Sequence, residues 1–191
     1  PARANPPIYL AFHWHMHQPI YWPYESVVQT ADSGRYGFDV AKVHTDRGGP
    51  YTSWPLDAVE AGMNAGLGHL GAQVSFSGSL MENLDNLAAA GRGFAGWTGR
   101  WRSGVSWRTS EGNPRVDIVR FGYHHPLMPL VDARDIGLQL ALHTEAATRR
   151  FGADGAGSRG IFPPETGFAV EIIPALVAAG IEWVIVDNIH F

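Results

Sequence analysis

The chain has 191 residues, 45% of them hydrophobic, which is enough to bury the core of one domain. Its formal net charge of −4 provides no basic surface, so we expect no nucleic-acid partner. It has no cysteines, which excludes disulfides and thiolate metal sites, and no apolar run long enough to span a membrane. The N-terminus also lacks a basic and then apolar leader, so we expect a cytoplasmic protein that needs neither a membrane nor a cofactor.

The first predicted element is a strand over residues 8–17, "IYLAFHWHMH". Alternate side chains of a strand point to opposite faces. One face is continuously apolar and consists of Ile8, Leu10, Phe12, Trp14 and Met16. The other face becomes polar toward its end, with His13, His15 and His17 on every second position. This pattern is typical of a barrel strand whose inner face ends at an active-site mouth.

The remaining elements repeat this layout. Further strands are predicted at residues 71–78, 116–126, 159–165 and 181–190. Helices are predicted at residues 79–91, 132–152 and 171–180. Strands that alternate with helices indicate βαβ units and a parallel sheet. We therefore predict an α/β protein of the parallel (β/α) barrel type, with about five strands present in this chain.

Two long stretches fit neither pattern, and we interpret residues 18–52 and 92–114 as βα-loop insertions in a single domain, 1–191. The second stretch carries Trp97, Trp101 and Trp107. Their large apolar rings suit either stacking on sugar rings or a small core under the loop. Trp22, in the first stretch, is a further candidate for substrate binding.

The histidine triplet has three interpretations. His13 and His15 resemble the His-x-His pair with which amidohydrolase-type enzymes begin a zinc site, because alternate positions aim two imidazoles at one ion. Neutral imidazoles also suit a polyhydroxylated substrate, since each one both donates and accepts a hydrogen bond. The third interpretation is a satisfied polar layer inside a barrel. The spacing alone does not choose between them.

Glu165 in "GIFPPETGF" is the strongest single candidate for catalysis. The two prolines before it keep the chain extended and prevent regular strand pairing. A carboxylate on a stiff backbone at a strand end meets the demands of a catalytic group. The alternative is a glutamate that interacts with the first turn of the following helix, and the local motif does not decide between the two.

Other polar residues are weaker candidates. His125, before Pro126, closes the third strand at the expected mouth, and Asp187 ends the fifth strand, where it suits substrate binding. Glu82 fits a capping box with Ser79, so capping is the favoured interpretation. His143 lies in the middle of a predicted helix and is expected to be structural.

Five motifs occur in order along almost the whole chain: "HWHMHQP", "SFSGSLMENL", "YHHPLMPL", "GIFPPETGF" and "AAGIEWVIVDNIHF". This ordered set resembles glycoside hydrolase family 57. The resemblance implies an incomplete, seven-stranded (β/α) barrel that acts on α-glucans, as an α-amylase, a 4-α-glucanotransferase or a branching enzyme. It further implies a retaining mechanism with a glutamate nucleophile and an aspartate acid/base, without a metal.

By this resemblance Glu165 is the nucleophile. His13, His15 and His17 line the sugar subsite, and His125 lies in the same mouth. Asp187 carries over only as a substrate-binding residue, because the acid/base aspartate of the family belongs to a later motif.

The chain departs from the family in having five predicted strands and no acid/base motif. We therefore expect that a C-terminal segment or another chain supplies the remainder of the enzyme, and that the isolated chain is inactive. Two alternatives stay open. One is a zinc amidohydrolase that uses His13 and His15, and the other is a non-catalytic protein that binds maltooligosaccharides.

Overall fold

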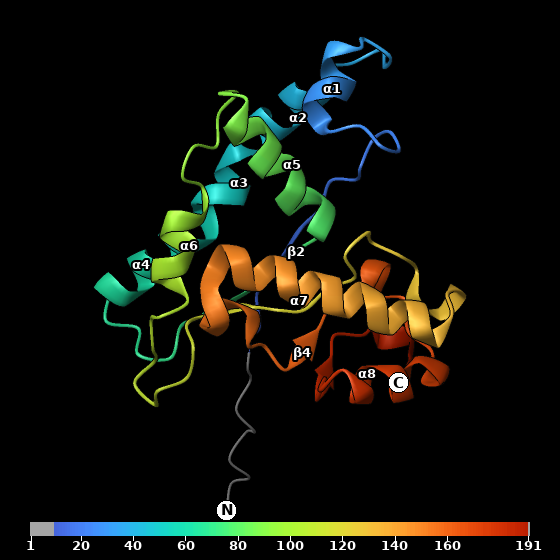
Figure 1. Cartoon of the computed structure of the whole chain (residues 1–191). Coiled ribbons are helices and arrows are strands. Elements are labelled where there is room, and N and C mark those ends of the chain that lie inside the picture. Colours follow the sequence, from blue (N-terminus) through green and yellow to red (C-terminus); the bar gives the residue numbers. More distant parts are fainter. Residues whose placement is uncertain (1–9, 191) are drawn as a thin grey trace, which may run out of the picture.

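The computed structural model describes residues 10–190, in which short parallel strands are flanked by helices (Figure 1). The strands are β1 (His13–Met16), β2 (Ala72–Phe76), β3 (Val116–Ile118), β4 (Gly160–Ile161) and β5 (Trp183–Val184). The α-helices are α1 (Val27–Asp32), α2 (Val40–Asp46), α3 (Gly48–Thr52), α4 (Trp54–Asn64), α5 (Gly78–Ala89), α6 (Thr98–Gly104), α7 (Ala133–Ala156) and α8 (Ile173–Ala178). Short 3-10 turns are η1 (Met128–Leu130), η2 (Pro164–Thr166), η3 (Val170–Ile172) and η4 (Asn188–His190).

All strand pairs are parallel. β1, β2 and β3 form one sheet in that order, and β4 pairs with β5 in a second sheet. A parallel bridge between Arg120 and Ile161 connects the two sheets. The five predicted strands are therefore present and follow one another in chain order, which confirms the α/β class.

The strands are shorter than the sequence predicted. In the first one, Leu10 and Phe12 precede β1 and are 80% and 53% exposed, so they are not part of the apolar face. Met16 is buried, and Trp14 packs partly against the same core. Ile8 lies outside the described residues. The alternation predicted the orientation of the side chains correctly, but only for the paired segment.

Helices cover the outer face of the sheets. The larger core lies under α4 to α7 and centres on side chains from all three strands of the first sheet, including Val74, Phe76 and Ile118. A second core joins β4 to α7 and α8 through Ile161, Leu140 and Leu176. In Figure 1, α7 runs across the middle of the molecule, with α5 and α6 on one side and α8 on the other.

The two predicted insertions contain helices. Residues 18–52 include α1, α2 and α3, and residues 92–114 include α6. Local caps explain the first two helices: Ser26 forms a capping box with Gln29, and Asp39 accepts hydrogen bonds from two backbone N–H groups of α2. None of the helices within residues 10–190 has the length and apolarity that crossing a membrane would require.

The capping box predicted for Ser79 and Glu82 is wrong. The N-cap of α5 is Ser77, two residues earlier than predicted, and its hydroxyl accepts a hydrogen bond from the Leu80 N–H. The Glu82 carboxylate instead accepts a hydrogen bond from the Tyr123 hydroxyl at 3.1 Å.

Candidate active site

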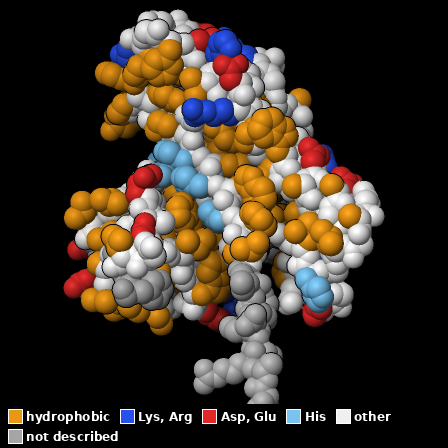
Figure 2. Space-filling view, turned by 180° about the vertical axis from the view of Figure 1, so that it is seen from behind, with side chains coloured by type: hydrophobic (Ala, Val, Ile, Leu, Met, Phe, Trp, Pro, Cys, Tyr) orange, Lys and Arg blue, Asp and Glu red, His pale blue; other side chains and the backbone are white. Residues whose placement is uncertain are grey.

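Polar side chains gather where the strands end. We define the mouth cluster as His13, His15, His17, His125 and Glu165, with the rings of Phe121 and Phe162 packed among them. The histidines come from β1 and from the loop after β3, whereas Glu165 follows β4. Figure 2 shows histidine side chains gathered on one face of the molecule, with acidic side chains beside them. Ligand sites of parallel α/β proteins are found at this end of the strands.

Two serines, one in β2 and one directly after it, form hydrogen bonds with the histidines of the β1 segment. Register places Ser75 directly beside His15, and the Ser75 Oγ lies 2.9 Å from His15 Nδ1 and 3.1 Å from His13 Nε2. The Ser77 Oγ lies 2.8 Å from His17 Nδ1 while it also caps α5. Both serines are fully buried. The imidazole orientations are therefore fixed from below by the neighbouring strand.

Aromatic rings pack against the imidazoles. The His15 ring centroid lies 5.0 Å from that of Phe121 and 4.9 Å from that of Phe162, and His17 stacks on His125 at 4.0 Å. His13, His17 and His125 are partly buried, whereas His15 is exposed to solvent.

Burial and neighbouring imidazoles keep these rings neutral. Burial lowers the pKa of His13 to about 4. Burial, together with the nearby His125, lowers the pKa of His15 to about 4 and that of His17 to about 3. The pKa of His125 is also lowered by burial, although the Glu165 carboxylate opposes this effect. Near neutral pH the cluster therefore presents uncharged rings that both donate and accept hydrogen bonds.

The Glu165 carboxylate stands at the edge of this cluster. Its Oε1 lies 3.4 Å from His125 Nε2, and its side chain is 73% exposed, so a ligand in the mouth can reach it. Both residues have left-handed backbone conformations, with φ of 59° at His125 and 57° at Glu165. Such a conformation costs roughly 1–3 kcal/mol for a residue other than glycine, and it is found where function requires it. The position after Pro163 and Pro164 agrees with the stiff strand end that the motif indicated.

The geometry does not favour zinc. His13 and His15 each use a ring nitrogen to bond the shared Ser75 hydroxyl, so a protein group already occupies the point on which these two nitrogens converge. Within residues 10–190, no group of three or more His, Cys, Asp or Glu side chains is arranged to hold a metal ion. The cluster is better suited to a neutral, hydroxyl-rich ligand.

The other candidate residues, Asp187 and Trp22, form their contacts with residues outside the mouth cluster. Asp187 accepts a hydrogen bond from the Ile189 N–H at 3.1 Å, a local turn contact that leaves its role in substrate binding a prediction. The Trp22 ring is 41% exposed and is covered on one face by the Arg35 guanidinium at 3.9 Å. Its predicted contact with a sugar is likewise untested.

The structure favours the core alternative for the tryptophans of residues 92–114 and agrees with the structural role expected for His143. Trp97 and Trp101 are buried in the larger core, with the Trp101 indole N–H donating to the Tyr51 carbonyl, so neither is free to stack on a sugar. Trp107 packs partly against the same core. His143 is buried in α7, and its Nε2 lies 2.8 Å from the Phe76 carbonyl oxygen.

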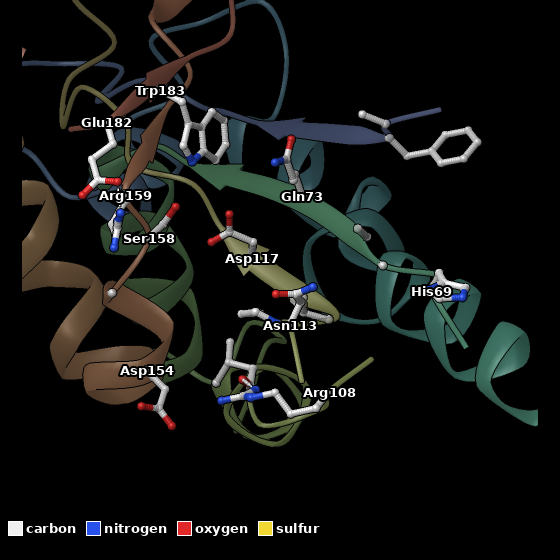
Figure 3. A pocket seen from close by; sticks show the side chains of 18 of the residues that line it. His69, Gln73, Arg108, Asn113, Asp117, Asp154, Ser158, Arg159, Glu182 and Trp183 are labelled. Atoms are coloured by element: carbon white, nitrogen blue, oxygen red, sulfur yellow. Dashed lines mark hydrogen bonds and ion pairs between the residues drawn. The ribbon is translucent and has the colours of Figure 1, made fainter. Parts of the chain in front are cut away.

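A cavity of about 840 Å³ opens at the opposite ends of the same strands (Figure 3). We call it the base cavity, and its lining includes Gln73, Asp117, Ser158, Arg159, Glu182 and Trp183. Arg159 and Glu182 form an ion pair at its rim. The Trp183 ring packs on the backbone at Gly160, where any side chain would collide with it. The bonded polar groups of the base cavity include the Asp117 carboxylate, which accepts a hydrogen bond from Ser158.

Sequence reasoning missed the residues that hold the site together. Ser75 and Ser77 alternate in "SFSGS" as the histidines alternate in β1, and this matching period was the available signal. Their partners depended on the register between β1 and β2, which the sequence does not state. Phe121 and Phe162 looked like ordinary core residues.

Comparison with known proteins places this arrangement in a family. The family model of glycosyl hydrolase family 57 matches residues 11–191. A curated protein named alpha-amylase, from Niallia circulans, is 30% identical over 155 residues, which are 78% of this chain and 12% of that protein. The chain therefore spans only a small part of this relative.

Two solved structures share the fold. The 4-alpha-glucanotransferase from Thermococcus litoralis superposes with a TM-score of 0.62 at 23% identity, over 95% of this chain and 22% of that one. The GH57-type branching enzyme from Pyrococcus horikoshii gives a TM-score of 0.56 at 18% identity, over 92% of this chain and 40% of that one. On the match of the family model to nearly the whole described chain, this protein belongs to glycosyl hydrolase family 57.

Proposed function

We propose that this chain provides the nucleophile and part of the sugar site of a retaining enzyme that acts on α-glucans. Family membership supports this proposal, as do the names of its relatives, an alpha-amylase, a 4-alpha-glucanotransferase and a branching enzyme. Both hydrolysis and glycosyl transfer are within the reach of the proposed mechanism. The substrate class is an α-glucan or a maltooligosaccharide, and the proposed location is the cytoplasm.

In the proposed mechanism the Glu165 carboxylate attacks the anomeric carbon of the bound sugar. The bond to the leaving oxygen breaks as an acid/base carboxyl group protonates that oxygen, which leaves a glycosyl ester on Glu165. Water or the hydroxyl of a second sugar then attacks the ester, and the same acid/base group takes up its proton. The neutral imidazoles of His13, His15 and His17 hold the sugar hydroxyls during both steps.

Retention requires a second carboxyl group about 5–5.5 Å from the first. We propose that an aspartate outside this chain supplies it, on the remaining strands of an incomplete seven-stranded (β/α) barrel. Within residues 10–190, β1 pairs only with β2 and β5 only with β4, so the outer edges of both strands are free to accept further strands. The loop after β5 places Asp187 at the mouth end, where we propose that it contacts substrate, with Trp22 as an outer stacking residue.

The observation that carries the proposal is the position of Glu165: an accessible carboxylate on a strained backbone beside four neutral imidazoles. In the complete enzyme, Glu165→Gln should lower kcat by about 10⁴-fold or more with little change in ground-state binding, since it removes bond formation and not sugar contacts. Steady-state kinetics on a soluble maltooligosaccharide measures this effect.

The matched control is Glu171→Gln, which makes the same change at an exposed glutamate six residues further along the chain. We expect its kcat to stay within about twofold of the wild type because surface substitutions away from a site are nearly neutral. A Glu165→Gln enzyme that retains a tenth of the wild-type kcat would end the proposal. A protein that binds maltooligosaccharides tightly, but that neither cleaves nor transfers them in complete form, would favour the non-catalytic alternative.

A further inference from the structure

The Ser75 hydroxyl joins two imidazoles and has no exposure to solvent. It lies 3.1 Å from His13 Nε2 and 2.9 Å from His15 Nδ1, and these are its hydrogen bonds among the described residues. A serine hydroxyl has one proton to donate and two lone pairs that accept. Its bonding therefore depends on which nitrogen of each ring carries the proton.

Burial keeps both rings neutral near pH 7 by lowering each pKa to about 4. Of the four tautomer combinations of two neutral rings, three allow Ser75 to bond both rings, because Ser75 has a single proton to donate. If both rings donate to Ser75, its own buried proton has no acceptor. If Ser75 donates to His13 Nε2, the proton of His13 must sit on Nδ1, which is buried without any hydrogen-bond partner. Both arrangements leave an orphaned donor inside the protein.

In the third arrangement, His13 Nε2–H donates to Ser75, and Ser75 donates to His15 Nδ1. Only the Nδ1 lone pair of His13 then lacks a partner. A buried acceptor without a partner is tolerated more often than a buried donor, and an unmade bond to a donor costs about 1–3 kcal/mol. The third arrangement is therefore the favoured one.

The tautomer of His15 determines, in turn, the tautomer of His125 at the mouth. With Ser75 donating to its Nδ1, His15 carries its proton on Nε2, which lies 3.3 Å from His125 Nε2. When His15 Nε2–H donates across this contact, His125 Nε2 accepts, so the proton of neutral His125 sits on Nδ1. The Glu165 Oε1, 3.4 Å from the same His125 Nε2, consequently receives no hydrogen bond from that ring. Its lone pairs stay available for attack on a sugar.

We propose that Ser75 is a positioning residue, which sets the tautomers of His13, His15 and His125 and so leaves the Glu165 carboxylate without a donor from His125. The proposal rests on the proposed role of Glu165 as the nucleophile. In this proposal the buried Ser75 hydroxyl contacts no substrate. It acts on the Glu165 carboxylate through the rings of His15 and His125.

Long-range proton–nitrogen NMR on the chain with isotope-labelled histidine tests the proposal, because it distinguishes Nδ1–H from Nε2–H rings. Signals are assigned with single His→Gln variants. At neutral pH we expect Nε2–H for His13 and His15 and Nδ1–H for His125. Ser75→Ala should convert His15 to a mixture of tautomers, and Ser75→Thr, which keeps the hydroxyl, should restore the wild-type pattern.

A His15 ring found as Nδ1–H in the wild-type chain, or a Ser75→Ala chain with unchanged tautomers, would overturn the proposal. The wild-type spectrum decides even where a variant fails to fold. In the complete enzyme, Ser75→Ala should lower kcat about 10-fold, the worth of one hydrogen bond, and Ser75→Thr should recover most of it. Ser106→Ala, which removes an exposed hydroxyl bonded to the Ser103 carbonyl, should leave kcat unchanged.

The outcomes separate this proposal from the proposed function. An active Glu165→Gln enzyme would refute the nucleophile, whatever the tautomers are. The opposite tautomers in a protein whose Glu165→Gln variant is inactive would refute only the role of Ser75.

Discussion

The two ends of the same parallel strands have different kinds of polar site. At the mouth cluster, the imidazoles are bonded to Ser75 and Ser77 and packed against aromatic rings, and the backbone at Glu165 is strained. At the base cavity, which has a volume of about 840 Å³, Arg159 and Glu182 pair with each other at the surface. Asp117 is the one carboxylate of that cavity on a strand, and burial raises its pKa while a hydrogen bond from Ser158 opposes the rise.

This difference shows that the volume of a cavity and the preorganisation of its polar groups are separate properties. A catalytic site needs groups whose orientation and protonation are fixed before the substrate arrives. The mouth cluster meets this requirement through buried hydroxyls, and the base cavity does not. The location agrees with the general rule that the carboxyl ends of parallel strands carry the function, while the opposite ends contribute stability.

The largest difference should be seen in activity. His15→Ala removes a ring that contacts His125 and that we propose binds a sugar hydroxyl, so kcat/KM of the complete enzyme should fall about 10–100-fold, the effect of one or two hydrogen bonds. Gln73→Ala, on the same face of the neighbouring strand but at the base, should change kcat/KM less than about threefold. Equal losses from the two variants would break the distinction between mouth and base.

The pH dependence of stability should differ in sign between the two ends. The folded-state pKa of His17 is about 3 and those of His13 and His15 are about 4, below the ordinary value of 6.5. The unfolded chain therefore binds protons first as the pH falls. The stability that these neutral histidines provide is complete above about pH 6.5 and is lost progressively as the pH falls toward 4.

Urea unfolding of the chain at a series of pH values measures this loss. His17→Gln, which keeps a polar side chain but cannot titrate, should have a shallower fall in unfolding free energy between pH 6.5 and 4. An unchanged slope would show that His17 is not held neutral by its surroundings. Glu171→Gln again provides a surface control.

The smallest expected effect concerns Asp117. Because its folded-state pKa is raised above the ordinary 3.8, this group favours folding most at low pH, and its contribution falls as the pH rises through that raised value. Asp117→Asn should therefore be slightly more stable than the wild type at neutral pH and lose this advantage in acid. Thermal melts at both pH values test this, and a destabilised variant at neutral pH would contradict it.

Sequence alone predicted the order of the strands and the inner face of β1, because the alternation of His13, His15 and His17 depends only on local geometry. It did not predict where the buried part of the strand begins, since Leu10 and Phe12 alternate equally well but have exposed side chains, although the Phe12 carbonyl still accepts a hydrogen bond from the Gln73 N–H of β2. The short helices α1 and α2 were missed although Ser26 and Gln29 formed a readable cap. Helices of six or seven residues are too short to show a recognisable helical period of apolar residues.

The sequence indicated residues that lie together at the candidate site, whose roles stay predictions, but not the hydrogen bonds between them. The prolines before Glu165 indicated a stiff strand end, but no sequence pattern indicated the left-handed conformations of His125 and Glu165. The bonds from Ser75 and Ser77 could not be predicted either, because they join residues about sixty positions apart and only the register of β1 with β2 aligns them.

The most direct test of the central claim is covalent trapping of the nucleophile. The complete enzyme is incubated with an activated α-glucosyl fluoride whose ring fluorine slows the second step, and the product is examined by intact mass and peptide mapping. The account predicts one added glucosyl unit, carried by Glu165, and no label on the Glu165→Gln enzyme. A stoichiometric label on a different carboxylate, with Glu165 unmodified, would contradict it.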